Sequence, residues 1–303
     1  MKKALAIYFT GTGNSKRIID LTSNELQKHD YAVDIVNVSD NHDTDICEYD
    51  LLVISYPIYA FNAPKPVIDY VKRFKKVEKP IKCVIVKNSG EHLFWNNASS
   101  LKLISILKRK NIIVTNEYHY LMPYSFMFRH SDYMAYRMYH TASMLIPMDI
   151  NDFFNDKEHH YKRFIFDRPF SFVFSIQRLG GKINGKTYKV NYEKCLKCHK
   201  CINECPAGNI KMDGEKIIFG GKCLMCQKCV MNCPTQAIKE GLFRKWQVGR
   251  PYSFEEVTTF QKEIKPHFCA KNYKRYFDES EERIRSARWK SYLYIIQILV
   301  MVN

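Results

Sequence analysis

The first 121 residues alternate short apolar runs with stretches in which apolar residues recur every three or four positions. The apolar runs at 3–9, 31–38, 50–55, 81–86 and 112–121 predict strands. Helical periodicity predicts helices between them, at 16–28, 63–76 and 98–110; Val67, Ile68 and Val71, for example, fall on one helix face. Strands that alternate with helices through short connections predict an α/β fold with a doubly wound parallel sheet.

The rest of the chain has a different pattern. Residues 124–180 are rich in aromatic residues and methionine, with a helix expected from Asp132 to about residue 145, and Gly180-Gly181-Lys182 reads as a linker. The predicted units are therefore 1–180 (including an aromatic-rich extension at 124–180), 181–241 and a helical C-terminal tail at 242–303. A helix is expected at 280–302, with charged residues in its first half and an apolar second half.

The apolar second half of that helix, 292–302, is too short to span a bilayer. Docking onto the protein's own surface is the favoured interpretation. A peripheral membrane contact through this tail, or an oligomer contact, is the alternative.

The 181–241 unit contains eight cysteines in two runs of identical spacing, C-x2-C-x2-C-x3-C-P. The runs are Cys195, Cys198, Cys201 and Cys205, then Cys223, Cys226, Cys229 and Cys233. Each C-x2-C-x2-C loop supplies three thiolates to a cubane, so the fourth must come from elsewhere. Two zinc sites are the alternative. A three-plus-one pattern, used twice and closed each time by proline, favours two [4Fe-4S] clusters and a small α+β domain.

A second motif lies between the first predicted strand and the first predicted helix. It reads Thr10, Gly11, Thr12, Gly13, Asn14, Ser15. A loop of glycines that leads into a helix N-terminus suits a phosphate, because backbone N–H groups and the helix dipole point at the anion. The loop lacks the lysine of a P-loop and does not fit G-x-G-x-x-G. Neutral donors of this kind suit a monophosphate.

Both motifs resemble those of known families. The Thr10–Ser15 loop is similar to the FMN-phosphate loop of flavodoxins, and the cysteine runs are similar to those of bacterial two-cluster ferredoxins. The whole chain resembles the flavodoxin–ferredoxin fusion proteins of anaerobic bacteria. In the ferredoxin pattern the last cysteine of each run ligates the other cluster. The resemblance therefore implies one cluster on Cys195, Cys198, Cys201 and Cys233, and the other on Cys223, Cys226, Cys229 and Cys205.

The flavodoxin resemblance also implies FMN contacts in two further loops. Pro57, Tyr59 and Ala60 follow the third predicted strand, and Asn88, Ser89 and Gly90 follow the fourth. Tyr59 is the candidate aromatic to pack on the flavin ring. One departure from ferredoxins is that Lys197 and Met225 stand where small residues are common.

The uneven distribution of charge along the chain indicates which class of partner it binds. The net charge is +16; residues 1–90 carry 13 Lys and Arg against 11 Asp and Glu, whereas residues 91–303 carry 34 against 20. A basic half fits an acidic protein, anionic lipid or nucleic acid, but no nucleic-acid fold signature accompanies it. We therefore expect redox partner proteins with acidic surfaces. Eleven cysteines, including Cys47, Cys83 and Cys269 outside the runs, favour a reducing compartment, the cytoplasm.

These features favour an electron-transfer protein that couples FMN to two [4Fe-4S] clusters, because FMN handles one or two electrons and each cluster one. The alternative is an FMN- and iron–sulfur-dependent oxidoreductase acting on a small molecule, with Tyr59 and His92 as the candidate proton donors. A cluster-containing sensor is motivated by charge alone. No residue is assigned a catalytic role.

Overall fold

The computed structural model describes residues 1–40, 43–257, 259–261 and 270–302; for residues 168, 170, 177–178, 288 and 290–302 the description covers the backbone only. Five parallel strands form its sheet: β1 (Lys2–Tyr8), β2 (Tyr31–Asn37), β3 (Leu51–Pro57), β4 (Ile81–Ser89) and β5 (Ile112–Leu121). Their order is β2-β1-β3-β4-β5, the flavodoxin-like order of doubly wound folds. The predicted fold class is confirmed.

Two hydrophobic cores cover the two faces of this sheet. Successive side chains of a strand point to opposite faces, so Ala4 and Ala6 lie in one core and Leu5 and Ile7 in the other. The first core is closed by α1 (Asn14–Lys28) and α4 (Asp132–Phe154). The second is closed by α2 (Lys65–Arg73) and α3 (Leu101–Arg109), the latter preceded by a 3-10 turn at Phe94–Ser100.

Helix α4 differs from its prediction in two respects. Ser131, rather than Asp132, caps it, because the Ser131 hydroxyl accepts a hydrogen bond from the N–H of Met134 at 3.1 Å. The helix also continues to Phe154, with Pro147 inside it. Its buried residues, such as Met138 and Ile146, pack in the same core as α1, so part of the aromatic-rich segment completes the cover of the sheet.

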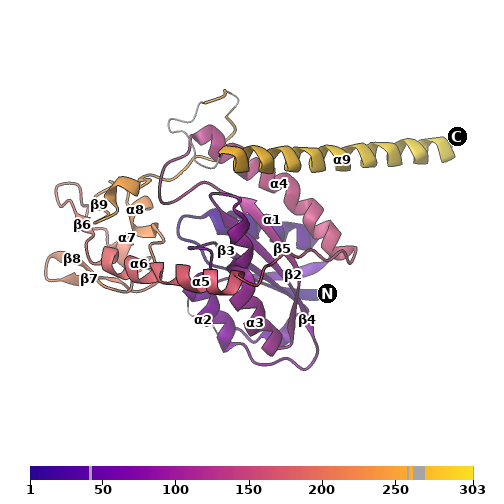
Figure 1. The fold of residues 1–303 in the computed structure, drawn as a ribbon. Helices are drawn as coiled ribbons and strands as arrows, with labels where there is room; N and C mark the ends of the chain where they lie inside the picture. The colour runs from indigo at the N-terminus through magenta and orange to yellow at the C-terminus, as the bar shows by residue number, and fades with distance from the viewer. Residues whose placement is uncertain (41–42, 258, 262–269, 303) are drawn as a thin grey trace.

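The residues predicted as a linker, Gly180–Lys182, are helical rather than irregular. Helix α5 (Asp167–Ser175) is followed by α6 (Gln177–Gly185), which contains all three linker residues. The two helices run across the sheet unit towards the cysteine-rich unit (Figure 1). Helix α5 is attached to the loop after β3 by Ser171, whose hydroxyl donates to Asn62 Oδ1 at 2.6 Å.

The cysteine-rich unit repeats one small motif twice. The first half contains α7 (Lys200–Asn203) and β7 (Ile210–Asp213), and the second contains α8 (Lys228–Met231) and β9 (Ile238–Lys239). Strand β7 pairs with β8 (Lys216–Phe219) in a hairpin, and β9 pairs with β6 (Lys189–Val190). Gly214 has a φ of 55° in the hairpin turn, a backbone region that glycine enters without steric cost.

The C-terminal helix α9 (Ala270–Val302) begins ten residues before its predicted start at 280. It lies beside α4 (Figure 1), and Tyr273, Tyr276 and Phe277 are buried in the core that α1 and α4 share. The first part of α9 is therefore docked on the protein itself, whereas the side chains of the apolar stretch 292–302 lie outside the described ones. Among the described residues, no helix combines the length and hydrophobicity that a membrane span requires.

An ion pair attaches α9 to α4. Arg283 Nη1 lies 2.5 Å from Oδ1 of Asp149, which is 2% exposed and also accepts a hydrogen bond from the Tyr120 hydroxyl at 2.7 Å. Arg283→Met leaves Asp149 buried without its counter-ion, so the free energy of unfolding should fall by about 2 kcal/mol. This is less than the cost of breaking a fully buried pair, because solvent screens the partly exposed Arg283. Urea unfolding measures this change. Arg285→Met, on the exposed side of the same helix, is the control and should change it by less than about 0.5 kcal/mol; equal effects of the two would contradict the role of the pair.

Candidate functional site

The two cysteine loops share an uncommon backbone conformation. In each loop the residue before and the residue after the second cysteine have positive φ: Lys197 (51°) and His199 (56°), then Met225 (53°) and Gln227 (63°). For a residue with a side chain this left-handed region costs roughly 1 kcal/mol. It turns the chain so that the three cysteines of each loop point inward. Glycine enters this region without steric cost, which explains why small residues are common at these positions; Lys197 and Met225 adopt the same conformation with their side chains in place.

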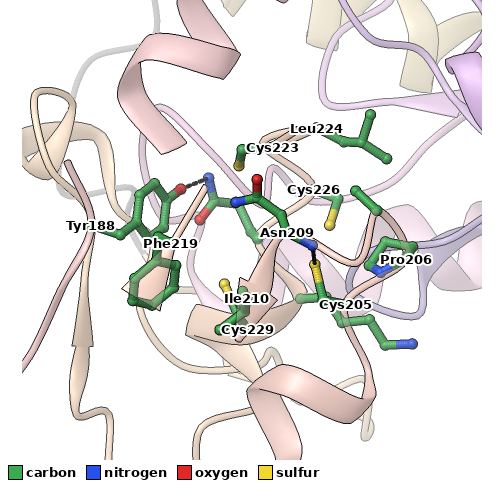
Figure 2. A pocket seen from close by; sticks show the side chains of 13 residues that line it. Tyr188, Cys205, Pro206, Asn209, Ile210, Phe219, Cys223, Leu224, Cys226 and Cys229 are labelled. Carbon is green, nitrogen blue, oxygen red and sulfur yellow. Dashed lines mark hydrogen bonds between the residues drawn. The ribbon is translucent and has the colours of Figure 1, made fainter. Parts of the chain in front are cut away.

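The structure groups the eight sulfurs into two pockets. One pocket is lined by Cys223, Cys226 and Cys229 together with Cys205 from the other run (Figure 2). The second is lined by Cys195, Cys198 and Cys201 together with Cys233. In the described part of the chain no three His, Cys, Asp or Glu side chains converge on a single-ion site. The arrangement brings together the two sets that the sequence predicts; that they ligate clusters remains a prediction.

Backbone N–H groups already point at the sulfurs. The N–H of Asn209 donates to Cys205 Sγ, the N–H of Ala237 to Cys233 Sγ, and the N–H of Met225 to Cys223 Sγ, each at 3.3 Å (Figure 2 shows the first). The first two are equivalent bonds in the two halves of the repeat. Such bonds stabilise negative charge on sulfur, which is one of the factors that set a cluster's reduction potential.

The two pockets differ in exposure. Cys226 and Cys229 are half-buried, and the packing around them raises the pKa of the Cys226 thiol to about 12 and that of Cys229 well above its usual value. Cys198, in the other pocket, is exposed. A buried thiol is a ligand only after it loses its proton, and bound metal supplies the charge that makes this favourable. We call the pockets the enclosed pocket (Cys223, Cys226, Cys229, Cys205) and the exposed pocket (Cys195, Cys198, Cys201, Cys233).

Glu240 is a charged group that the sequence interpretation missed. It is 2% exposed and follows β9. Burial raises the pKa of its carboxyl to about 7, an effect that the Gln227 amide only partly offsets. Gln227 lies in the enclosed pocket, so a group that changes charge near neutral pH lies close to this pocket. A single Glu seven residues after a cysteine run gives no sequence signal of this kind.

The Thr10–Ser15 loop uses several of its polar side chains to hold its own shape. Thr10 Oγ1 accepts a hydrogen bond from the N–H of Gly13 at 2.9 Å, and Asn14 Nδ2 donates to the carbonyl of Pro123 at 2.9 Å. Ser15 Oγ accepts from Asn88 Nδ2 at 2.6 Å. Helix α1 begins at Asn14, and the first N–H groups of a helix have no acceptor within it. Both hydroxyls act as acceptors in these bonds, so their O–H groups remain available to donate to an anion alongside the backbone N–H groups.

Arg17 corrects the expectation that this loop has neutral donors only. Its guanidinium lies next to Gly13, because a Cβ placed on Gly13 would be 2.6 Å from Arg17 Nη1. It also stacks over the Phe254 ring, 4.2 Å from the ring centroid. Burial lowers the pKa of Arg17, and the salt bridges found among the described residues do not include it. A single Arg four residues after a glycine is not a recognisable motif, which is why the sequence did not reveal it.

The loops after β3 and β4 lie beside the Thr10–Ser15 loop, at the carboxyl ends of the strands, as the fold class predicts. The N–H of Ile58, next to Pro57, donates to the carbonyl of Asn88 at 2.8 Å. Ser89 Oγ bonds His119 Nε2 at 2.7 Å, and the Tyr124 ring lies against Gly90, about 2.5 Å from the place of a Cβ. Phe94 and Trp95, the aromatic residues further along the loop after β4, are exposed at the surface.

Tyr59 lies between the sheet unit and the enclosed pocket. Its ring meets that of Phe9 edge to face, with centroids 6.2 Å apart. Burial raises the pKa of its hydroxyl well above the usual value, and the Cys226 and Cys223 thiols raise it further. Ala60 follows in the left-handed region, with a φ of 48°. Tyr59 thus packs towards the cysteine loop; its role as a flavin contact remains a prediction.

The cysteine loop of the enclosed pocket lies directly on the Thr10–Ser15 loop. A Cβ on Gly11 would be 1.9 Å from the carbonyl oxygen of Cys226. Leu224 and Cys226 also pack against the core of the sheet unit that includes Ile58 and Tyr59. On the other side, a Cβ on Gly185 of α6 would be 2.2 Å from Cys223 Cβ. The enclosed pocket is therefore the one that borders the sheet unit.

Comparison with known proteins found matches to the two parts separately. The family described as a 4Fe-4S dicluster domain matches residues 193–238. No curated protein sequence matches the chain.

Solved structures similar to half of this chain include a short-chain flavodoxin associated with a non-canonical PDU bacterial microcompartment (14% identity, 98% of that chain, TM-score 0.37). They also include oxidised flavodoxin 1 from Bacillus cereus (11% identity, 50% of this chain and 98% of that chain, TM-score 0.37). A third is an NADH:FMN oxidoreductase in its apo form (11% identity, 50% of this chain and 88% of that chain, TM-score 0.40). By its own strand order the sheet unit has a flavodoxin-like α/β fold, and residues 193–238 match the 4Fe-4S dicluster family, so the chain fits the arrangement of a flavodoxin–ferredoxin fusion.

Proposed function

We propose that this chain is an electron-transfer protein in which FMN, held at the Thr10–Ser15 loop, exchanges electrons with two [4Fe-4S] clusters. The observation that carries the proposal is the contact between Gly11 and the carbonyl of Cys226. It joins the loop that suits a phosphate to the loop that suits a cluster. FMN would supply the exchange between one- and two-electron steps, and each cluster would carry one electron.

The residues of the loop fit a phosphate group. Helix α1 presents its first N–H groups and the positive end of its dipole there, and Arg17 adds a cation beside Gly13. Tyr59, Asn88 and Tyr124 lie around the same strand ends. Their part in the proposal is to enclose the flavin ring and exclude water from it.

The difference in exposure sets the order of transfer. The enclosed pocket borders the Thr10–Ser15 loop, whereas the exposed pocket contains Cys198 at the surface. A cluster in the exposed pocket is then the one that meets an external redox partner, and a cluster in the enclosed pocket passes electrons on to FMN. Of the nearby lysines, Lys197 is paired with Glu215 at 2.6 Å; Lys194 is exposed and suits an acidic partner surface.

The structure gives less support to the reductase alternative. Burial lowers the pKa of His92 to about 4, so this imidazole is neutral at pH 7 and is a poor proton donor there. Its ring stacks on that of His119, with centroids 4.8 Å apart. The Tyr59 hydroxyl also holds its proton tightly, as the raised pKa shows. Electron transfer to a redox protein needs neither donor.

The first prediction tests the ligand sets. Cys205→Ser should destroy the cluster of the enclosed pocket and preserve most of the other, and Cys233→Ser should do the converse, because each of these residues lines the pocket of the opposite run. Electron paramagnetic resonance of the two dithionite-reduced variants measures which signal is lost. Loss of the same signal in both variants, or zinc in place of iron in the wild type, would rule out this assignment.

The second prediction concerns Arg17. Arg17→Gln removes a cation next to the proposed phosphate, so FMN affinity should fall about ten- to a hundredfold while riboflavin affinity stays unchanged. Titration of the flavin-free protein with FMN or riboflavin, followed by quenching of flavin fluorescence, measures both affinities. Lys16→Gln is the matched control, because Lys16 is engaged with Asp20 at 2.5 Å. Equal affinity of the wild type for FMN and riboflavin would contradict the phosphate site itself.

The third prediction tests the contact between the loops. Gly11→Ala places a methyl group where the Cys226 carbonyl lies, so the cysteine loop must move away. Electron transfer from the reduced clusters to FMN should slow by about tenfold or more, a change of at least about 1.4 kcal/mol in the barrier. Stopped-flow absorbance of anaerobic protein mixed with limiting dithionite measures the rate.

Gly180→Ala is the control for that experiment. A Cβ on Gly180 meets no atom within 4 Å, and alanine favours the helix in which Gly180 lies. The FMN content of each variant is measured first, so that loss of cofactor is not mistaken for slow transfer. An unchanged rate in Gly11→Ala protein that retains FMN would show that the contact is not the transfer route.

A further inference from the structure

Helices α5 and α6, with the residues just before and between them, carry a row of exposed apolar side chains. We call Ile165, Phe172, Ile176, Leu179 and Ile183 the α5–α6 stripe; their exposed fractions run from 55% for Leu179 to 86% for Ile165. From Phe172 onwards the members are three or four residues apart, so they fall on one face of the helices. Phe166 and Val173 are exposed beside the stripe. Contiguous apolar surface of this kind marks an interaction site.

The opposite face of the same helices is already used. Phe174 meets the Phe61 ring edge to face at 4.9 Å, and Asp167 and Asn184 are buried. Gly185 lies against Cys223, as described above. The helices are therefore fixed to the sheet unit and to the enclosed pocket by this buried face, and the stripe points away from both units.

The segment that carries the stripe is rich in positive charge. Within residues 159–192 the sequence contains seven Lys and Arg and a single acidic residue, Asp167, and Asp167 is buried. Lys162, Lys182 and Lys186 are exposed there. Bulky apolar side chains on one face with cations beside them are typical of helices that lie in the interface of an anionic membrane.

We propose that the α5–α6 stripe docks on an anionic membrane surface. The helices span 19 residues, or roughly 28 Å end to end, and the cations beside the stripe would meet the lipid headgroups while Phe172 and its neighbours enter the acyl boundary. A second copy of the chain fits less well, because a two-fold contact through the stripe brings the same lysines together. This surface is distinct from the C-terminal tail, and the proposal does not depend on either cofactor.

Docking in this orientation has a structural consequence. The buried face of α6 lies on the cysteine loop of the enclosed pocket, and that of α5 lies on the loop after β3. The membrane would therefore lie on the far side of the two helices from the proposed electron route. The surface around Cys198 is carried by the other half of the cysteine-rich unit.

The test is co-sedimentation of the full-length protein with vesicles of phosphatidylcholine alone or mixed with phosphatidylglycerol. We expect binding to the mixed vesicles, weaker binding to phosphatidylcholine, and loss of binding as salt rises, because the Debye length falls to about 3 Å at 1 M. The double variant Phe172→Ser, Ile176→Ser should bind the mixed vesicles at least about tenfold more weakly. Lys182→Glu with Lys186→Glu should do the same while leaving the stripe intact.

Matched variants and a size measurement keep the outcome clear. Ile113→Ser removes an exposed apolar side chain of the sheet unit and should bind like the wild type, and Phe172→Trp should retain binding. The C-terminal tail is intact in every variant, so binding that survives in Phe172→Ser, Ile176→Ser would assign it to the tail and overturn the proposal. No binding by the wild type would overturn it too, as would a wild-type dimer in light scattering that the double variant converts to a monomer.

Discussion

The contact between the Cys226 carbonyl and the Cα of Gly11 is the constraint on which the relation of the two units depends. A Cβ at position 11 would lie 1.9 Å from the Cys226 carbonyl oxygen, so only glycine leaves room for this carbonyl. The same glycine belongs to a loop whose N–H groups suit a phosphate, so one residue meets two demands: approach by an anion and approach by a cysteine loop. The position of the cysteine-rich unit follows, since Leu224 and Cys226 complete the hydrophobic core around Ile58 and Tyr59.

The asymmetry between the two pockets follows from that contact. The repeat gives both halves the same spacing, the same positive-φ residues and equivalent N–H···S bonds from Asn209 and Ala237. The halves differ because one of them packs against Gly11 and Gly185. The enclosed pocket is then surrounded by protein of low dielectric and lies close to the Glu240 carboxyl, whereas the exposed pocket is in contact with solvent. Two sites of similar covalent chemistry thus acquire different surroundings, which is how proteins set different reduction potentials.

Much of this could be predicted from the sequence, because the signals are local. Strand positions, the helix after Ser15 and the hairpin at Gly214 follow from periodicity and turn residues over a few positions. The grouping of Cys205 with the later run in one pocket is what the resemblance to two-cluster ferredoxins implies. Gly180 and Gly181 suggested a linker, whereas both lie in α6; it is the lack of a side chain at Gly185 that lets this helix lie close to the cysteine loop. Arg17 and Glu240 could not be identified, since their significance depends on what surrounds them in three dimensions.

The enclosure of Cys226 and Cys223 also bears on how the protein matures. Gly11 and Gly185 border this cysteine loop on two sides, and Cys223 and Cys226 are half-buried, whereas Cys198 in the other half is exposed. If both pockets hold clusters as proposed, iron and sulfide would reach the half with Cys198 directly from solvent in the folded chain. Loading of the inner half would instead be linked to the seating of α6 and the sheet unit around it, so the two halves would differ in how readily a lost cluster is replaced.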